Sequence, residues 1–202
     1  MPELIVATKN KGKLKEIREL LRGLDFQVTS LADYPDAPLI VEDGRTFRAN
    51  AAKKALTIAR WSKKLTLGED SGLQVRALDN RPGVYSSRFA GDQATDKKNN
   101  AKLLRLLRGI PLNERQARYR CVAVLADGKG IVDVLSGSCP GLIAERSRGS
   151  NGFGYDPLFL LPRYQQTFGQ LDPHIKARIS HRAKAMKKVR QTLQQYLVRI
   201  KP

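Results

Sequence analysis

The apolar positions at the start of the chain follow two different patterns. Leu4–Ala7 is an unbroken apolar run, which predicts a buried strand, and the polar segment Thr8–Gly12 after it predicts a turn. From Leu14 to Leu24, leucine and isoleucine recur every three to four positions, which predicts an amphipathic helix with one apolar stripe. The chain therefore opens with a strand, a polar loop and a helix.

Similar signals continue through the first half of the chain. They predict a strand at Phe26–Leu31, an Ala-rich helix from its N-cap Thr46 to about Trp61, and strands at Leu65–Leu67 and Leu73–Leu78. The last two strands flank an acidic turn, Gly68–Gly72. Thr95 can cap a further helix with a set of inward-facing leucines: Leu103, Leu104, Leu106 and Leu107.

The second half of the chain is dominated by a predicted hairpin. Its strands are the apolar runs Tyr119–Ala126 and Ile131–Ser138, and another short strand is expected around Leu142–Ala144. A Gly-rich loop follows at Gly149–Pro157, and helical spacing from about Pro173 predicts one long C-terminal helix. Early alternation of helices and strands with later hairpins is typical of an α/β domain with a mixed sheet. The length of 202 residues predicts a single domain over residues 1–202, either one ordinary globular unit or one domain with two lobes.

Charge is the unusual feature of the composition. The formal net charge is +18, and most of the excess lies after residue 100, which favours a polyanionic partner. The longest apolar run, Cys121–Ala126, is far shorter than the roughly 20 residues that span a bilayer, and no signal-peptide pattern opens the chain. The only cysteines, Cys121 and Cys139, form no CxxC pair, so we expect reduced thiols in a cytoplasmic protein.

Several reaction classes are excluded because their motifs are absent. The sequence contains no HExxH, no GxSxG, no GxGxxG after a strand and no GxxxxGK[ST], and its only histidines are His174 and His181. These absences exclude zinc proteases, serine hydrolases, dinucleotide-binding domains and P-loop proteins.

A first candidate site is the basic segment Thr8–Lys13. A helix N-terminus offers unpaired N–H groups and a positive dipole end, and Lys9, Lys11 and Lys13 add charge, which favours a phosphate site. By spacing alone, a solvated basic turn explains the segment equally well.

A second candidate consists of two acidic pairs, Glu42-Asp43 and Glu69-Asp70. Mg²⁺ prefers oxygen ligands and commonly binds one or two carboxylates together with substrate phosphates. The alternative is that these acids lie in turns, where Asp70 and Ser71 bond only to the local backbone.

Two further segments offer groups that could contact a ligand. Lys176, Ser180, His181 and Arg182 fall at the start of the predicted last helix, although a histidine in a basic helix is more often a solvated surface residue. In Gly152–Pro157 an aromatic plane could stack on a ligand ring, or its aromatic side chains could belong to the core. Phosphate, metal and ring sites together indicate a nucleotide.

Six segments, in order, resemble the inosine triphosphate pyrophosphatase family, also called the noncanonical purine NTP pyrophosphatases. The segments are Ala7–Lys13, Glu42–Phe47 with Asn50-Ala51, Asp70–Leu73, Pro82–Arg88 with Ala90-Gly91, Gly152–Pro157 and Ser180–Arg182. The resemblance covers about residues 4 to 198. It implies an α/β fold with a central mixed, elongated twisted sheet, helices packed on it, and two lobes around a nucleotide cleft.

The resemblance also implies an activity. Members are homodimeric, Mg²⁺-dependent hydrolases that cleave ITP, dITP or XTP between the α- and β-phosphates, releasing the monophosphate and pyrophosphate. It implies a small-molecule nucleoside triphosphate as partner, a cytoplasmic location, no membrane association and no specific nucleic-acid binding. The alternative, motivated by the charge, is a basic, non-catalytic nucleic-acid-binding protein.

Residue roles follow from the same resemblance. Asp70 is implied as the catalytic base, and Glu42 and Asp70 as metal ligands. Substrate binding is implied for Thr8, Lys9, Asn10, Lys11, Gly12, Lys13, Ser71, Phe153, Gly154, Tyr155, Asp156, Lys176, His181 and Arg182. The chain departs from the family pattern at Ala49, Arg76, Gln170 and His174-Ile175, where acids are common in the family.

Overall fold

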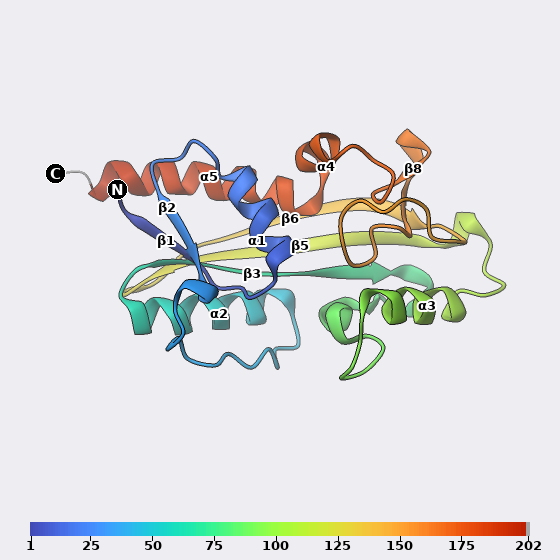
Figure 1. Ribbon diagram of the computed structural model, residues 1–202, viewed down its shortest axis with the longest axis horizontal. Coiled ribbons are helices and arrows are strands. Elements are labelled where there is room, and N and C mark those ends of the chain that lie inside the picture. The colour runs from blue at the N-terminus through green and yellow to red at the C-terminus, as the bar shows by residue number, and fades with distance from the viewer. Residues whose placement is uncertain (201–202) are drawn as a thin grey trace. The chain divides into compact units, whose positions relative to one another are not determined.

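Helices and strands alternate along the first half of the chain, and long strands dominate the middle (Figure 1). The computed structural model describes residues 1–200. In chain order the elements are β1 (Glu3–Val6), α1 (Lys11–Leu20), β2 (Gln27–Ser30), η1 (Leu31–Asp33), α2 (Phe47–Ser62), β3 (Leu65–Val75), η2 (Arg76–Leu78), β4 (Arg81–Pro82), η3 (Gly83–Arg88), α3 (Asp96–Leu106), η4 (Leu112–Glu114), β5 (Gln116–Asp127), β6 (Gly130–Ile143), β7 (Phe159–Leu161), η5 (Pro162–Tyr164), β8 (Gln166–Thr167), α4 (Pro173–Ile179) and α5 (His181–Ile200), where η marks a 3₁₀ helix. None of the helices within residues 1–200 is long and apolar enough to cross a bilayer.

The strands form one mixed sheet in the order β2-β1-β3-β5-β6-β7-β8, with β4 paired to β3. Strand β1 runs parallel to β2 and to β3, with Leu4 opposite Val28 and Leu65. The pairs β3–β4, β6–β7 and β7–β8 are antiparallel. The predicted α/β fold with a central mixed sheet is confirmed.

The chain divides into two compact units. The first consists of Met1–Asp70, Cys121–Gly137 and the chain from Arg182 onward, and the second of Ser71–Arg120 and Ser138–His181. Each boundary within the sheet falls inside a strand, so β3, β5 and β6 contribute residues to both units.

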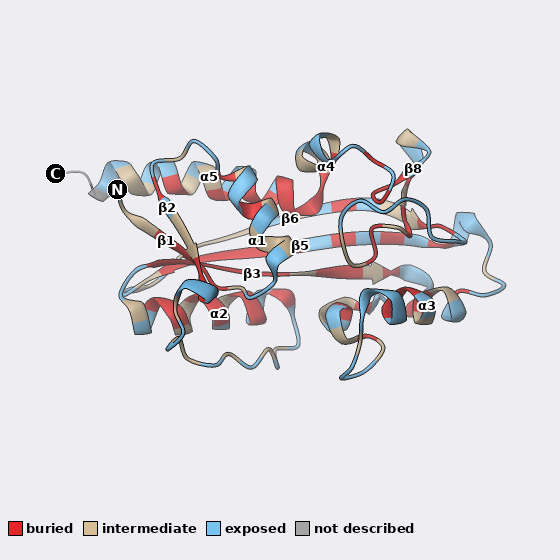
Figure 2. Ribbon diagram, in the orientation of Figure 1, coloured by how far each residue is buried: buried red, intermediate tan, exposed pale blue. Residues whose placement is uncertain are grey.

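In the first unit, helices cover both faces of the sheet. Leu4 and Val6 of β1 pack in a cluster with buried residues of α1 and α5, whereas Ile5 and Ala7 pack with Ile58 of α2. Alternate residues of a strand point to opposite faces, so α1 and α5 cover one face and α2 the other, as Figure 1 shows. Buried residues accordingly line the inner faces of these helices (Figure 2).

The second unit has a core rich in aromatic rings. Tyr119 of β5 packs on Phe159 of β7 with ring centroids 4.6 Å apart, and Phe159 packs on Phe168 at 5.1 Å. Leu103 and Leu107 join this cluster at the inner side of α3, with Leu107 as its C-cap residue. Leu106 is 36% exposed, so the prediction that it faces inward is wrong.

Both predicted N-caps are confirmed. The hydroxyl oxygen of Thr46 accepts a hydrogen bond from Ala49 N at 3.1 Å, and that of Thr95 accepts one from Lys98 N at 3.2 Å. Each cap satisfies an N–H group that the first helical turn leaves without an intrahelical partner.

The predicted acidic turn between two short strands is wrong. Leu65–Val75 is one continuous strand, β3, and Gly68, Glu69 and Asp70 lie inside it. A glycine followed by paired acids is typical of a turn, but here the missing side chain of Gly68 lets the backbone of α2 pack directly against the strand. A Cβ atom on Gly68 would lie 2.2 Å from Ala51 O and 2.6 Å from Ala55 N. Close approach of a helix backbone therefore explains this glycine in mid-strand.

We expect Gly68→Ala to lower the free energy of unfolding by about 2 kcal/mol, because α2 must move away from β3 to admit a methyl group. Urea denaturation of the variant and the parent measures the change. Gly128→Ala is the matched control, since a Cβ there has its nearest neighbour, Lys63 Cδ, at 3.9 Å. Equal stability of both variants would contradict the proposed close approach.

Two other element predictions are also corrected. The strand expected at Leu142–Ala144 is the end of β6, which is longer than predicted because it continues through Ile143. The single C-terminal helix is two helices, α4 and α5, separated by Ser180 in an extended conformation with ψ 162°. The periodicity did not reveal the break because both helices have apolar faces.

Candidate functional site

The N-terminus of α1 is held by two local hydrogen bonds. Asn10 is the N-cap, and its Oδ1 accepts a hydrogen bond from Lys13 N at 2.9 Å, while Thr8 Oγ1 accepts one from Asn10 N at 3.1 Å. The helix begins at Lys11, so Gly12 lies in its first turn rather than in a preceding loop. Lys9 and Lys11 are exposed there, which leaves a positively charged helix end.

A buried charge cluster lies on the α1/α5 face of β3. Glu69 is only 1% exposed; its Oε2 forms an ion pair with Lys13 Nζ at 2.9 Å, and its Oε1 accepts a hydrogen bond from Arg182 Nη2 at 3.1 Å. The other guanidinium nitrogen of Arg182, Nη1, bonds to Glu16, and the Cys121 thiol donates to Glu69 Oε1 at 3.2 Å. Lys13, predicted from the basic segment, is thus neutralised by a residue from the supposed turn.

This arrangement fixes the ionisation of the cluster. Burial alone would raise the pKa of Glu69, but Arg182 and Lys13 outweigh it and hold that pKa well below its usual value. Burial and the neighbouring Glu69 carboxylate raise the pKa of the Cys121 thiol well above its usual value. Glu69 is therefore an anion between two cations, and Cys121 stays a thiol.

Asp70 has a different environment, because consecutive strand residues point to opposite faces. Its Oδ2 accepts a hydrogen bond from Asn50 Nδ2 of α2 at 3.1 Å, and its Oδ1 lies 3.7 Å from Lys54 Nζ. Lys54 also bonds to Glu42 Oε2 at 2.5 Å, so one ammonium group approaches both predicted metal ligands. Burial raises the pKa of Asp70, which makes its carboxylate a stronger base.

The donor set fits Mg²⁺ when substrate phosphates complete it. Within the described part of the chain, no group of three or more His, Cys, Asp or Glu side chains could hold a metal ion. Glu42 and Asp70 supply two carboxylates, and Mg²⁺ is commonly held by one or two carboxylates plus phosphate and water.

In the second unit, the buried Asp156 and Lys176 contact the half-buried Phe153. Asp156 Oδ2 accepts hydrogen bonds from Phe153 N at 2.8 Å and from Lys176 Nζ at 2.7 Å. Lys176 Nζ lies 5.1 Å from the Phe153 ring centroid, within cation–π range. Lys176 belongs to α4, so this helix and the Gly-rich loop are joined through a desolvated ion pair.

His181 and Tyr155 are both buried rather than on a surface. The His181 ring stacks on Tyr119, with centroids 4.6 Å apart and planes 7° from parallel. The Tyr155 hydroxyl donates to Ser86 O at 2.8 Å, and burial raises its pKa. The structure therefore places Tyr155 in the core, which was one of the two interpretations left open for this loop.

The break at Ser180 separates residues expected on one helix. His181 belongs to the second unit with Tyr119, whereas Arg182 belongs to the first unit with Glu69. Lys176 lies in α4, whereas His181 and Arg182 begin α5, so the expectation that all of them share one helix is wrong. Ser71 follows Asp70 in β3 but is counted in the second unit.

Two neighbours of Asp70 were not among the predicted site residues. Asn50 and Lys54 are 1% and 6% exposed, and both lie on the buried face of α2. The signal was present in the sequence: they follow the same three-to-four spacing as the buried alanines Ala51 and Ala55. A lysine in an apolar stripe indicates a buried carboxylate partner.

The chain is similar to known proteins over nearly its whole length. A dITP/XTP pyrophosphatase of Desulforamulus reducens is 50% identical over 191 residues, 95% of each chain, and one of Geobacter sulfurreducens is 47% identical over 92% of this chain and 94% of that one. A HAM1 protein from Coxiella burnetii superposes with a TM-score of 0.88 at 38% identity, covering 96% of this chain and 100% of its own. The Ham1 protein of Staphylococcus aureus superposes with 0.86 at 34%, covering 96% and 99%.

The family resemblance drawn from the motifs is confirmed by a family model. The model of the Ham1 family matches residues 4–192, which include the charge cluster around Glu69, the Asp70 environment and the Phe153–Lys176 group. The chain therefore belongs to the Ham1 family.

Proposed function

We propose that this protein is a nucleoside triphosphate pyrophosphatase that hydrolyses dITP, ITP and XTP to the monophosphate and pyrophosphate. Eight relatives that are 42–50% identical are dITP/XTP pyrophosphatases, which supports this reaction for the present chain. The observation that carries the proposal is the buried Asp70 carboxylate, with a raised pKa, beside Lys54, whose ammonium group also bonds to Glu42.

In this proposal residues of the first unit bind the phosphates and activate the attacking water. Asp70 takes the proton of the attacking water, because water is a poor nucleophile until a base accepts that proton. Glu42 and Asp70 would hold Mg²⁺, which when bound would supply positive charge against the phosphate oxygens. The N-terminal end of α1, with Thr8 and Lys13, binds phosphate through its N–H groups and positive charge.

In the same proposal the second unit handles the base. Phe153 offers a ring for stacking, and Lys176 and His181 offer hydrogen-bond donors. Hypoxanthine and xanthine carry an oxo acceptor at C6, whereas adenine carries an amino donor there and would leave such donors unpaired. Both terminal guanidinium nitrogens of Arg182 bond to carboxylates, so we assign Arg182 to holding Glu69 rather than to a base contact.

The expected substrate profile follows from this selectivity. With Mg²⁺ present, kcat/KM for pyrophosphate release should be about 10³-fold higher for dITP and XTP than for dATP, because the wrong base leaves buried donors unpaired. Purified protein, the three nucleotides and a coupled pyrophosphate assay measure the ratio. No release from dITP, ITP or XTP would reject the proposed function, and tight, salt-sensitive RNA or duplex binding would then favour the nucleic-acid alternative.

We also propose Mg²⁺ as the metal, a homodimer as the functional form, and the cytoplasm as its location. Loss of turnover in EDTA with recovery on adding Mg²⁺ tests the metal. Sedimentation equilibrium gives the molar mass, for which 22.6 kDa is the value of one chain.

A further inference from the structure

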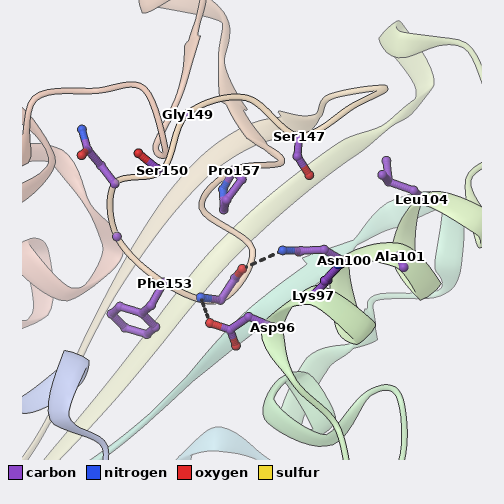
Figure 3. Close-up of a pocket in the computed structure, with 13 residues that line it drawn as sticks. Asp96, Lys97, Asn100, Ala101, Leu104, Ser147, Gly149, Ser150, Phe153 and Pro157 are labelled. Carbon is purple, nitrogen blue, oxygen red and sulfur yellow. Dashed lines mark hydrogen bonds between the residues drawn. The ribbon is translucent and has the colours of Figure 1, made fainter.

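Two side chains of helix α3 hydrogen-bond to the backbone N–H and C=O groups of one residue of the Gly-rich loop, Gly154. Asp96 Oδ2 accepts a hydrogen bond from Gly154 N at 2.7 Å, and Asn100 Nδ2 donates to Gly154 O at 3.0 Å. The two side chains are four residues apart, so they project from the same face of α3. Figure 3 shows both bonds at the border of a cavity of about 470 Å³ between α3 and this loop.

The residues next to Gly154 also form hydrogen bonds within the loop. Phe153 N donates to Asp156 Oδ2 at 2.8 Å, and Asp156 N donates to Phe153 O at 3.2 Å. Gly152 has φ +78°, and a Cβ atom there would lie 2.0 Å from Asp156 Oδ2. Consecutive N–H groups, those of Phe153 and Gly154, are thus each bound by a carboxylate, and the backbone conformation of the loop is specified on both sides of Phe153.

We propose that Asp96 and Asn100 are positioning residues that set the orientation of the Phe153 ring towards the purine. The proposal rests on the proposed function, in which Phe153 stacks on the base. Since the N–H groups of Phe153 and Gly154 are already used within the chain, this part of the loop recognises the purine through its aromatic ring and not through those N–H groups. The specificity of the loop then depends on a helix that itself makes no contact with the base.

Kinetics of variants test the proposal. We expect KM for dITP to rise about fivefold in Asp96→Ala and about tenfold in Asn100→Leu, with kcat within about twofold of the parent. The effect of Asn100→Leu is larger because Asn100 is more buried than Asp96, so the lost bond leaves Gly154 O without its partner in a less solvated place. Asp96→Asn keeps an acceptor oxygen and should restore KM to within about twofold.

Lys97→Ala is the matched control. Lys97 lines the same cavity and is exposed, and it is not among the proposed substrate-binding residues, so its loss should leave KM and kcat unchanged. A fall in kcat with unchanged KM in the Asp96 and Asn100 variants, or the same KM change in Lys97→Ala, would overturn the proposal.

Hydrogen exchange separates this proposal from the proposed function. In Asp96→Ala we expect amide exchange in peptides covering 149–158 to accelerate at least about tenfold, while exchange in 99–106 of α3 stays at the parent rate. Equal acceleration in both segments would show that Asp96 only stabilises α3 and would overturn the positioning role. This measurement needs no substrate, so it holds even if the nucleotide assay rejects the pyrophosphatase.

Discussion

We expect Asp70→Asn to lower kcat for pyrophosphate release from dITP by about 10³-fold, with KM within about threefold of the parent. Asparagine keeps the size of Asp70 and an oxygen that can accept from Asn50, but it cannot take the proton of the attacking water. Because asparagine has the size of aspartate and Lys54 keeps its bond to Glu42, the substitution should leave the fold and the phosphate-binding end of α1 intact. Steady-state kinetics with dITP and saturating Mg²⁺ give both constants.

Asp43→Asn is the control for this prediction. Asp43 is the neighbour of Glu42, its side chain is 65% exposed, and it bonds to Lys53 rather than to Lys54. We expect its kcat to equal that of the parent. Retention of more than about a tenth of the parental kcat in Asp70→Asn would remove Asp70 from the role of base.

Glu69→Ala lowers the free energy of unfolding by about 3 to 5 kcal/mol, the largest stability effect we expect for a single substitution in this protein. The variant removes the carboxylate partner of Lys13 and one of the two carboxylates that contact the buried Arg182. Urea denaturation at pH 7 measures the change. Glu69→Gln keeps the shape of the side chain and should lose less, which guards against a variant that fails to fold.

The Glu69 carboxylate also makes the free energy of unfolding depend on pH. The pKa of Glu69 is lower in the folded protein than its ordinary value of 4.5, so its stabilising contribution is complete above about pH 4.5 and is lost as the pH falls through the folded pKa. The parent should therefore lose stability more steeply than Glu69→Gln below pH 4.5. Glu114→Ala, at an exposed position of the second unit, should show the parental profile, and identical acid profiles for Glu69→Gln and the parent would contradict this account.

The elements that could be predicted from sequence are those set by local interactions. The N-caps Thr46 and Thr95 and the first parallel strand depend on neighbours within a few residues, and local periodicity reveals them. Local sequence predicts a turn within strand β3 because the partners of its charged side chains are distant in sequence. Glu69 bonds to Arg182, 113 residues later. A window of a few residues contains an acidic pair and two glycines but not the distant cations, so it is read as a turn.

The same limit applies to the candidate site. The order of the motifs led to Lys13, Glu42, Asp70 and Lys176, and the structure gives each of them a charged neighbour. No pattern among the acids indicated that Glu69 and Asp70 would face opposite sides of one strand, because that follows only once the strand is continuous. The sequence did not predict Lys54 as a site residue, because a lysine in an Ala-rich helix is ordinarily assigned to the solvent-exposed face.

The sequence separation of the Glu69–Arg182 contact also matters while the protein is being made. A ribosome produces the chain from its N-terminus, so Glu69 is synthesised more than a hundred residues before Arg182. Helix α5 also brings Ala185, Met186 and Val189 to the core of the first unit. The nascent first unit therefore lacks one of the two cations that contact Glu69, and part of its apolar covering, until residues 182–189 have been synthesised, and during this delay its exposed apolar surface is prone to aggregation.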